Sequence, residues 1–438
     1  MLAAVGVSSV EELFADIPRD VRFQGGLQIP SALTEAELLR YFGALAERNR
    51  HVETRPSLLG AGVYRHFVPA VVDAVISRAE FSTAYTPYQP EASQGTLQAI
   101  FEFQSMMCAL AGLDVANASL YDGASAAAEA ALLCASSSGR GRLLVSRAVH
   151  PEYREVLKTY TISGELKVEE IGLDEGLTSL SALGDMLGSD VAGVIVQDPN
   201  FFGIVEASEE LAKRVHDAGA ALVVLNNDLS AYGLLKRPGQ WGADVAAGEA
   251  AATGLPPSLG GPFAGFIAVR DAFTKRLPGR LVGVTSDGQG RRGFCLTLQT
   301  REQHIRREKA TSNICTNQSL CALAVTVYLT ALGPQGLREV AGASARRARY
   351  LMQGFEKAGL RRRFSSPFYH EFVMRADDPG AVNEALAREG IVGGYPLGKA
   401  YPELADCLLF CATETLTRGD VDAAVKAVAA ARHKVGVQ

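Results

Sequence analysis

From residue 96 onward, short apolar runs alternate with stretches of helical periodicity. Several of these runs are almost continuously apolar, which is typical of strands that helices bury on both faces. Helical patterns fill the intervals, notably over 96–111 and from Asp122 to about Ser136. The predicted strands lie at 142–146, 167–171, 193–197, 221–225, 244–247 and 265–269. This alternation predicts an α/β fold with a large, doubly wound and mostly parallel sheet.

The two ends of the chain show other patterns. Before residue 80 helical signals dominate, with a short capped helix over 8–14 and a longer one over 31–49 that Thr34 caps. The apolar face of the longer helix carries Leu38, Leu39, Phe42 and Leu45. Further helices are predicted at 70–79, 318–332, 336–358, 379–389 and 418–429, with strands at 369–375 and 408–412. We therefore expect an N-terminal helical arm over 1–80, a large α/β domain over 81–320, and a linking helix with a small C-terminal α+β domain over 321–438.

Composition narrows the class of protein. The 438 residues carry a formal net charge of −5, and the basic runs are short, which argues against a nucleic-acid partner. The opening residues lack the basic and apolar regions of a signal peptide, and no apolar run reaches the length of a membrane span. The seven cysteines form no metal-binding spacing, and their apolar neighbours predict reduced thiols. We expect a cytoplasmic protein without a bound metal.

Residues 81–95 combine two tyrosines, two prolines, amides and a carboxylate. Pro87 and Pro90 bias the residues before them away from helix, so the segment is expected to be a stiff, extended loop that opens into a helix near Thr96. So many polar groups would each need a buried partner inside a core. The segment is therefore either an ordered surface loop or part of a site.

A second group of polar residues is expected at the carboxyl edge of the sheet, where open α/β sheets bind ligands. The turn at Asp122, Gly123 and Ser125 opens a helix, and such a helix N-terminus attracts anions such as phosphate. His150 can either contact a ligand or cap the helix that begins at Pro151. The turns 198–200 and 226–228 follow neighbouring strands, and turn chemistry alone explains them equally well.

Residues 301–317 read as a charged helix that runs into a hydrogen-bonding turn at 311–313. Charge runs on helices are usually solvated, but a polar turn with a cysteine between two helices is less easily explained by solvation alone. A different signal is an absence: no lysine occurs between Lys236 and Lys275. A pyridoxal phosphate enzyme needs a lysine there for its Schiff base, and no other side chain can replace that amine.

Four stretches together resemble the P-protein family of the glycine cleavage system, and more narrowly the first (alpha) subunit of its two-chain form. The resemblance extends over nearly the whole chain, and the opening residues 6–18 also fit it. The stretches are Tyr85-Thr86-Pro87-Tyr88-Gln89-Pro90-Glu91 with Ser93-Gln94-Gly95, then 116–125, 259–262 and 307–317. The resemblance implies a fold type I, aspartate-aminotransferase-like architecture for an enzyme that takes glycine on pyridoxal phosphate, releases CO2, and passes the aminomethyl group to lipoylated H-protein.

In the two-chain form, the resemblance places the pyridoxal lysine in the second (beta) subunit, which agrees with the missing lysine here. We expect an alpha2beta2 assembly in which this chain has no catalytic residue of its own, and in which its polar residues reach the partner's glycine site or lipoyl entrance. Asp122, Gly123 and Ser125 are then expected to form a vestigial anion site. The expected contributors to the partner's site are Tyr85, Tyr88, Gln89, Glu91, Gln94, His150, Arg307, Thr311, Ser312 and Asn313.

Two alternatives remain open at this point. The chain could be a non-catalytic pseudoenzyme subunit of the same complex, in which these residues serve only packing. It could also be a self-contained pyridoxal aminotransferase or desulfurase that uses Lys236 or Lys275.

Overall fold

The computed structural model describes residues 1–23, 25–49, 51–258, 260–310 and 312–435, and side chains as far as Ala431. The chain divides into two compact units, Met1–Thr54 and Arg55–Gln438. The predicted boundaries at residues 80 and 320 fall inside the second unit and stay predictions.

The first unit consists of helical segments and extended chain. Its elements are α1 (Leu2–Val5), η1 (Glu11–Phe14) and α2 (Glu35–Ala46). Thr34 and Glu37 form a reciprocal capping box at the start of α2, so the sequence-based cap is correct. The expected short helix near residue 8 is a 3-10 turn over Glu11–Phe14, because Ser8 and Ser9 both bond Glu12 and hold the chain in a tight turn.

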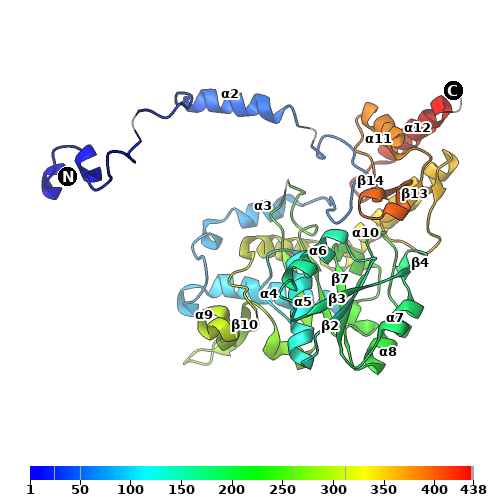
Figure 1. The fold of residues 1–438 in the computed structure, drawn as a ribbon, viewed down its shortest axis with the longest axis horizontal. Helices are drawn as coiled ribbons and strands as arrows, with labels where there is room; N and C mark the ends of the chain where they lie inside the picture. The colour runs from blue at the N-terminus through cyan, green and yellow to red at the C-terminus, as the bar shows by residue number, and fades with distance from the viewer. Residues whose placement is uncertain (24, 50, 259, 311, 436–438) are drawn as a thin grey trace. The chain divides into compact units, whose positions relative to one another are not determined.

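A seven-stranded sheet forms the centre of the second unit (Figure 1). Its order is β1-β9-β8-β7-β6-β2-β3, in which the five strands from β8 to β3 run parallel and β9 is antiparallel to β8. The strands are β1 (Val115–Ala116), β2 (Arg142–Ser146), β3 (Lys167–Ile171), β6 (Val191–Gln197), β7 (Ala221–Asn226), β8 (Val245–Glu249) and β9 (Gly265–Val269). The predicted parallel sheet is therefore correct, and the antiparallel edge was not foreseen.

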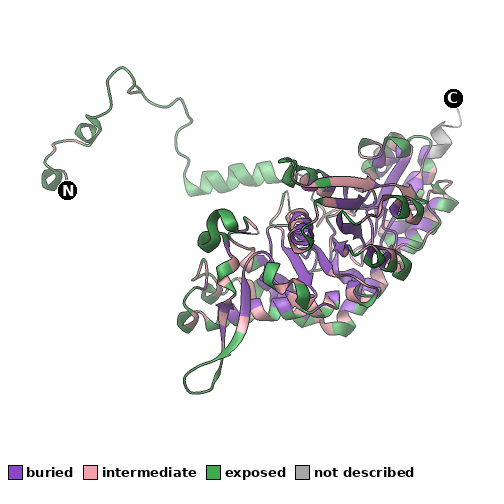
Figure 2. Cartoon of the chain, turned by 60° about the horizontal axis from the view of Figure 1, so that its bottom comes forward, coloured by how far each residue is buried: buried purple, intermediate pink, exposed green. Residues whose placement is uncertain are grey.

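Alternate residues of each strand enter two different cores. Leu143 and Val145 pack with α5, whereas Leu144 packs on the other face with residues of α8. Because both faces are covered, the strands are buried almost throughout, which explains their near-continuous apolar sequences (Figure 2). The helices before and between the strands are α3 (Ala70–Ile76), α4 (Gln94–Ala111), α5 (Gly123–Ser138), α6 (Pro151–Tyr160), α7 (Leu180–Met186) and α8 (Glu209–Asp217).

A second, four-stranded antiparallel sheet lies near the C-terminus, in the order β12-β13-β15-β14. It packs with α11 and α12 around buried apolar residues such as Phe372 and Phe410. Its elements are β12 (Arg361–Arg362), β13 (Glu371–Arg375), α11 (Pro379–Arg388), β14 (Tyr395–Pro396), β15 (Cys407–Cys411) and α12 (Arg418–Val435). Two hairpins complete the sheets, β4 (Leu173–Asp174) with β5 (Leu177–Thr178) and β10 (Leu281–Ser286) with β11 (Arg292–Thr297).

Helix α10 (Ser319–Lys357) joins the core of the large sheet to that of the small one. Its backbone leaves helical geometry at Gly333, directly before Pro334, so it is two helices that meet at a kink, as the two predicted helices 318–332 and 336–358 indicate. Among the described helices, α10 is long and apolar enough to cross a membrane by length and composition. A core helix passes the same test, and 44% of the most apolar window of α10 is buried inside the protein.

Candidate functional site

Polar side chains gather where β6, β7 and β8 end. Asp198 follows β6, Asn227 and Asp228 follow β7, and Glu249 is the last residue of β8; all four are buried. Because these strands are parallel, their carboxyl ends meet at one edge of the sheet. The two turns that the sequence analysis noted, 198–200 and 226–228, thus lie together as expected.

Glu249 is hydrogen-bonded to the first turn of α5. One carboxylate oxygen, Oε2, accepts from the Gly123 amide at 3.0 Å. The other, Oε1, accepts from the amides of Ala251 at 2.9 Å and Ala264 at 2.7 Å. Burial raises the pKa of Glu249 to about 7, and the three amide hydrogen bonds oppose that rise.

Asp122 is the N-cap residue of α5. Its Oδ1 accepts from the Ser125 amide at 2.8 Å and its Oδ2 from the Ser125 hydroxyl at 3.2 Å. Of the three residues expected to bind an anion, Gly123 and Ser125 therefore donate to carboxylates of the chain itself. Asp122 is one of these carboxylates, and Glu249 is the other. The position of this helix N-terminus was predicted correctly from the sequence, whereas the contribution of Glu249, which lies more than a hundred residues away, was not predicted.

A small cavity of about 20 Å³ adjoins this arrangement, with room for about one water molecule. Its lining includes Gly62, Tyr64, Asn227, Glu249 and Phe263. Both side-chain atoms of Asn227, Oδ1 and Nδ2, are buried and have no hydrogen-bond partner among the described residues. A buried amide without partners is rare and indicates a polar ligand or a water molecule.

These residues do not fit a phosphorylated cofactor. A carboxylate already occupies the helix N-terminus that would receive the phosphate, and a second negative charge there would be repelled. The cavity beside it is far smaller than the ligand pockets of several hundred Å³ that proteins usually offer.

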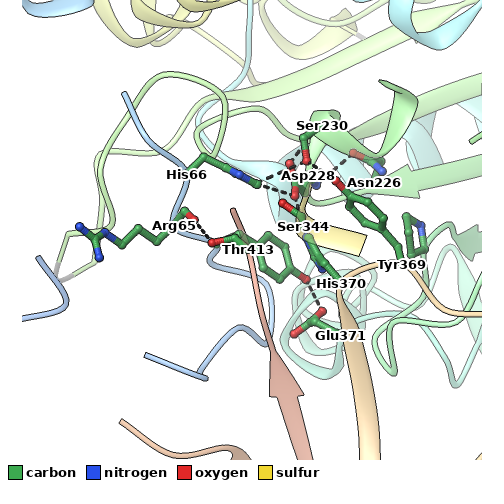
Figure 3. A network of polar contacts seen from close by, with 12 residues as sticks. Arg65, His66, Asn226, Asp228, Ser230, Ser344, Tyr369, His370, Glu371 and Thr413 are labelled. Atoms are coloured by element: carbon green, nitrogen blue, oxygen red, sulfur yellow. Dashed lines mark hydrogen bonds and ion pairs between the residues drawn. The ribbon is translucent and has the colours of Figure 1, made fainter. Parts of the chain in front are cut away.

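Figure 3 shows a largely buried network of polar contacts around Asp228, the residue that follows the cavity-lining Asn227. One oxygen of Asp228, Oδ2, accepts from His66 Nε2 at 2.9 Å and from His370 Nε2 at 2.7 Å. His66 Nδ1 lies 2.7 Å from Glu414. Because these groups come from the segment before α3, the end of β7 and the small sheet, the network ties three distant parts of the second unit together.

The charges of this network reinforce one another. Burial opposes the charged form of His66, but Asp228 and Glu414 raise its pKa to about 10. Burial likewise opposes ionisation of Asp228, but His66 and His370 hold its pKa well below the ordinary value. His66, Asp228 and His370 could by spacing hold a metal ion, yet a metal ligand must be a deprotonated imidazole. A protonated His66 between two carboxylates instead makes this a structural ion network.

The sequence left open whether His150 contacts a ligand or caps the helix that begins at Pro151, and the structure shows the cap. Its Nδ1 accepts from the Glu152 amide at 3.2 Å, so it caps α6. Its Nε2 lies 2.9 Å from the carbonyl oxygen of Ala61, and its ring packs edge-on against Phe201. Gly62 lies so close to this ring that a Cβ there would approach it to 2.8 Å. His150 is 8% exposed, so neighbouring residues of the chain cover most of it.

Most of the segment 81–95 lies at the surface, which does not decide between the two alternatives that its sequence left open, and α4 begins within it at Gln94. Tyr85 is 84% exposed and Tyr88 is 53% exposed, with the Tyr88 ring 6.3 Å from that of His304. Gln89 and Glu91 are also exposed. Gln94 has a structural partner, since its amide exchanges two hydrogen bonds with the backbone of Phe294 in β11, at 2.8 and 2.9 Å.

The prediction of one charged helix over 301–310 is wrong. The structure has three short helices, η7 (Gln299–Arg301), α9 (Gln303–Arg306) and η8 (Arg307–Lys309). Arg307 adopts a φ of 54°, which ends the helix, and such short pieces have little helical stability of their own. Arg307 and Asn313 are exposed and Ser312 is partly buried, whereas Thr311 lies outside the described residues.

The stretches 116–125 and 307–317 contact each other directly. The Tyr121 hydroxyl accepts from the Cys315 amide at 3.2 Å. The Asn317 amide donates to Ser119 Oγ at 3.0 Å and to the Ala118 carbonyl at 3.2 Å. Ser312 also hydrogen-bonds Glu129, a buried residue of α5 whose pKa burial raises to about 7. Nearly two hundred residues separate these stretches, so sequence spacing could not have shown that they meet.

Comparisons with known proteins agree with this architecture. Residues 1–428 match the family described as "Glycine cleavage system P-protein". Proteins named glycine dehydrogenase (decarboxylating) subunit 1 are 52% identical in Anoxybacillus flavithermus, over 97% of this chain and 95% of that one, and 50% identical in Desulfitobacterium hafniense, over 96% and 95%.

Solved structures give the same result. A crystal structure of glycine decarboxylase (P-protein) of the glycine cleavage system, in inhibitor-bound form, has a TM-score of 0.91 and 45% identity over 98% of this chain and 97% of that one. Glutamate decarboxylase of Lactobacillus brevis shares the fold alone, with a TM-score of 0.70 and 12% identity over 96% and 97% of the two chains. The predicted fold type I architecture and the resemblance are both confirmed. The chain belongs to the P-protein family of the glycine cleavage system.

Proposed function

We propose that this chain is subunit 1 of a glycine dehydrogenase (decarboxylating). With a second subunit, it takes glycine, releases CO2 and passes the aminomethyl group to the lipoyl arm of H-protein. The observation that carries the proposal is a closed cleft in a member of this family, in which Glu249 is hydrogen-bonded to the helix that would hold a phosphate. A helix N-terminus that a carboxylate of the chain itself occupies supports a function that depends on a partner subunit.

In this proposal pyridoxal phosphate belongs to the second subunit, where it supplies an electron sink for the carbanion that decarboxylation leaves. The missing lysine between Lys236 and Lys275 supports this placement. Lys236 is 62% exposed and pairs with Glu209 at 2.8 Å, and Lys275 is exposed on η6 (Asp271–Arg276), so neither supports a self-contained enzyme. We further propose an alpha2beta2 assembly in the cytoplasm, and the seven free cysteines suit a reducing compartment.

The first unit supports an interface with that second subunit. Its extended chain exposes large apolar residues, among them Val21, Phe23, Leu27 and Ile29, each at least 68% exposed. Helix α2 is exposed along its whole length (Figure 2), and its Leu39 and Phe42 are 70% and 60% exposed. Apolar surface of this extent usually marks a protein interface.

The exposed residues of the loop over 81–95 and of the turn near 313 are proposed to reach the partner's glycine site or its lipoyl entrance. Tyr85, Tyr88, Gln89, Glu91, Arg307 and Asn313 are free to do so by their exposure. Gln94, His150 and Ser312 have partners within the chain, so we assign them a positioning role.

The deciding experiment is glycine–bicarbonate exchange by this chain, by a lysine-bearing second subunit, and by their mixture, each with lipoylated H-protein. We expect this chain alone to be colourless and inactive and the mixture to be active. An aldimine absorbance band in this chain alone would overturn the proposal. Full exchange by the second subunit without this chain would leave only a structural role.

Replacing Tyr88 or Asn313 with alanine is expected to lower exchange by the assembled enzyme about tenfold to hundredfold, because misplaced contacts at a reacting centre cost that much. Assembly, followed by size-exclusion chromatography, should be unchanged. Gln335→Ala is the matched control, since Gln335 is exposed on α10 and bonds only Glu339 among the contacts described. Normal exchange in both variants would show that these residues serve packing or no role at all.

A further inference from the structure

One side chain, that of Glu249, closes the carboxyl edge of the sheet beside the N-terminus of α5. Glu249 is 4% exposed, and each of its carboxylate oxygens is hydrogen-bonded. One hydrogen bond comes from the amide of Gly123, the first residue of α5, a helix of 16 residues. The other two come from the amides of Ala251 and Ala264, at the two ends of the loop between β8 and β9. The carboxylate therefore joins a helix N-terminus to the strand ends, as a bound anion does at such a position.

Space around the helix N-terminus is filled on its other side as well. Gly123 has no side chain, and a Cβ at this position would collide with the hydroxyl of Tyr153. Tyr153 is held in the core between α5 and α6, against the ring of His150 at 5.2 Å. The turn is thus tight around Glu249, without room for a second anion.

Asn227 is an independent observation that points to a polar ligand at this place. It is 3% exposed, it lines the same cavity as Glu249, and both polar atoms of its side chain lack a partner among the described residues. An amide that is left unsatisfied in this way costs about 1–3 kcal/mol unless a ligand or water meets it.

Other buried carboxylates do not share this arrangement. Glu206 accepts from the backbone of Thr178 and from Asn200, and Asp198 accepts from the amide of Glu206. The hydrogen bonds of Glu206 and Asp198 do not involve the first residue of a helix. Glu249 alone among these three is bonded to the glycine amide that opens a long helix.

We infer that Glu249 is a built-in anion that takes the place of a cofactor phosphate on the N-terminus of α5 and so closes this cleft to phosphorylated ligands. Removing its carboxylate opens a site for a tetrahedral oxyanion, bound by the Gly123 amide with the amide of Asn227 close by. The inference goes beyond the proposed function, and its test requires no enzymatic activity, so either can fail without the other.

The test compares wild type, Glu249→Ala and Glu249→Gln at pH 8, where the carboxylate is ionised, with inorganic phosphate as the probe and chloride at equal ionic strength as the reference. Thermal unfolding and phosphorus NMR report binding. We expect no saturable phosphate binding by wild type. Glu249→Ala should be less stable in chloride and should regain stability as phosphate is added, with the saturable phosphate binding that wild type lacks.

Glu249→Gln is the matched control, because its carboxamide fills the same space without the charge, and phosphate should not stabilise it. If Glu249→Ala does not fold in chloride, its refolding yield with and without phosphate gives the same answer. Equal phosphate binding by wild type and Glu249→Ala, or none by Glu249→Ala, would overturn the inference.

Discussion

Asp228→Asn is expected to lower the free energy of unfolding by about 3–5 kcal/mol, because it removes one of the two carboxylates that pair with the buried, protonated His66, and the carboxylate that accepts from His370. His66 and Asp228 have side chains that are 0% and 3% exposed, so water cannot compensate for the lost charge. Asparagine has almost the same shape as aspartate, so the loss reports the charge and its hydrogen bonds rather than a cavity. Urea unfolding of the full chain, followed by circular dichroism, measures it.

The matched control is Asp217→Asn on α8. Asp217 also pairs with a cation, Lys213 at 2.7 Å, but their side chains are 64% and 69% exposed. Exposed pairs contribute about 0–1 kcal/mol, so this variant should unfold close to wild type. Equal and small losses in both variants would show that the Asp228 network does not stabilise the second unit.

The same network gives the stability of wild type a pH dependence of known sign. The pKa of His66 is about 10 in the folded chain and about 6.5 when it is unfolded, so its stabilisation is complete below about pH 6.5 and is lost as the pH rises toward 10. Asp228 and Glu414 have lowered pKa values, so their stabilisation is lost instead as the pH falls through the acid range. Asp228→Asn should therefore flatten the alkaline fall.

The elements of the fold could be predicted because their signals are local. Strands such as Arg142–Ser146 are buried on both faces, so their sequences are apolar without alternation, and Thr34 caps α2 with atoms three residues away. The place of the cleft was also predictable, because parallel strands bring their carboxyl ends together. These inferences need only neighbouring residues and one topological rule.

The chemistry of the cleft could not be predicted in the same way. Glu249 meets Gly123 across 126 positions, and His66 meets Asp228 across 162. No local pattern distinguishes such a glutamate from a strand-ending residue, or such a histidine from one in a loop. The prediction of a helix near Arg307 was wrong although it rested on a local signal. The composition there favours a helix, but Arg307 adopts a positive φ, which ends the helix.

Leu39→Glu combined with Phe42→Glu is expected to weaken binding of the second subunit by about 1,000-fold, since two buried apolar anchors at an interface together contribute about 4 kcal/mol. Leu39 is 70% and Phe42 is 60% exposed on α2, so their apolar side chains are available to a partner. Glutamate is a good helix former, so α2 itself should persist. Sedimentation or titration calorimetry with the second subunit measures the affinity.

Arg40→Glu is the control, because it introduces the same residue on the same helix at a position about 180° from the centre of the apolar face. It should bind the second subunit within a few-fold of wild type, and all variants should keep the thermal stability of the second unit. Unchanged affinity in the double variant would remove α2 from the subunit interface. A double variant that binds normally but no longer pairs with a further copy of this chain would instead assign the apolar face to a contact between two alpha subunits.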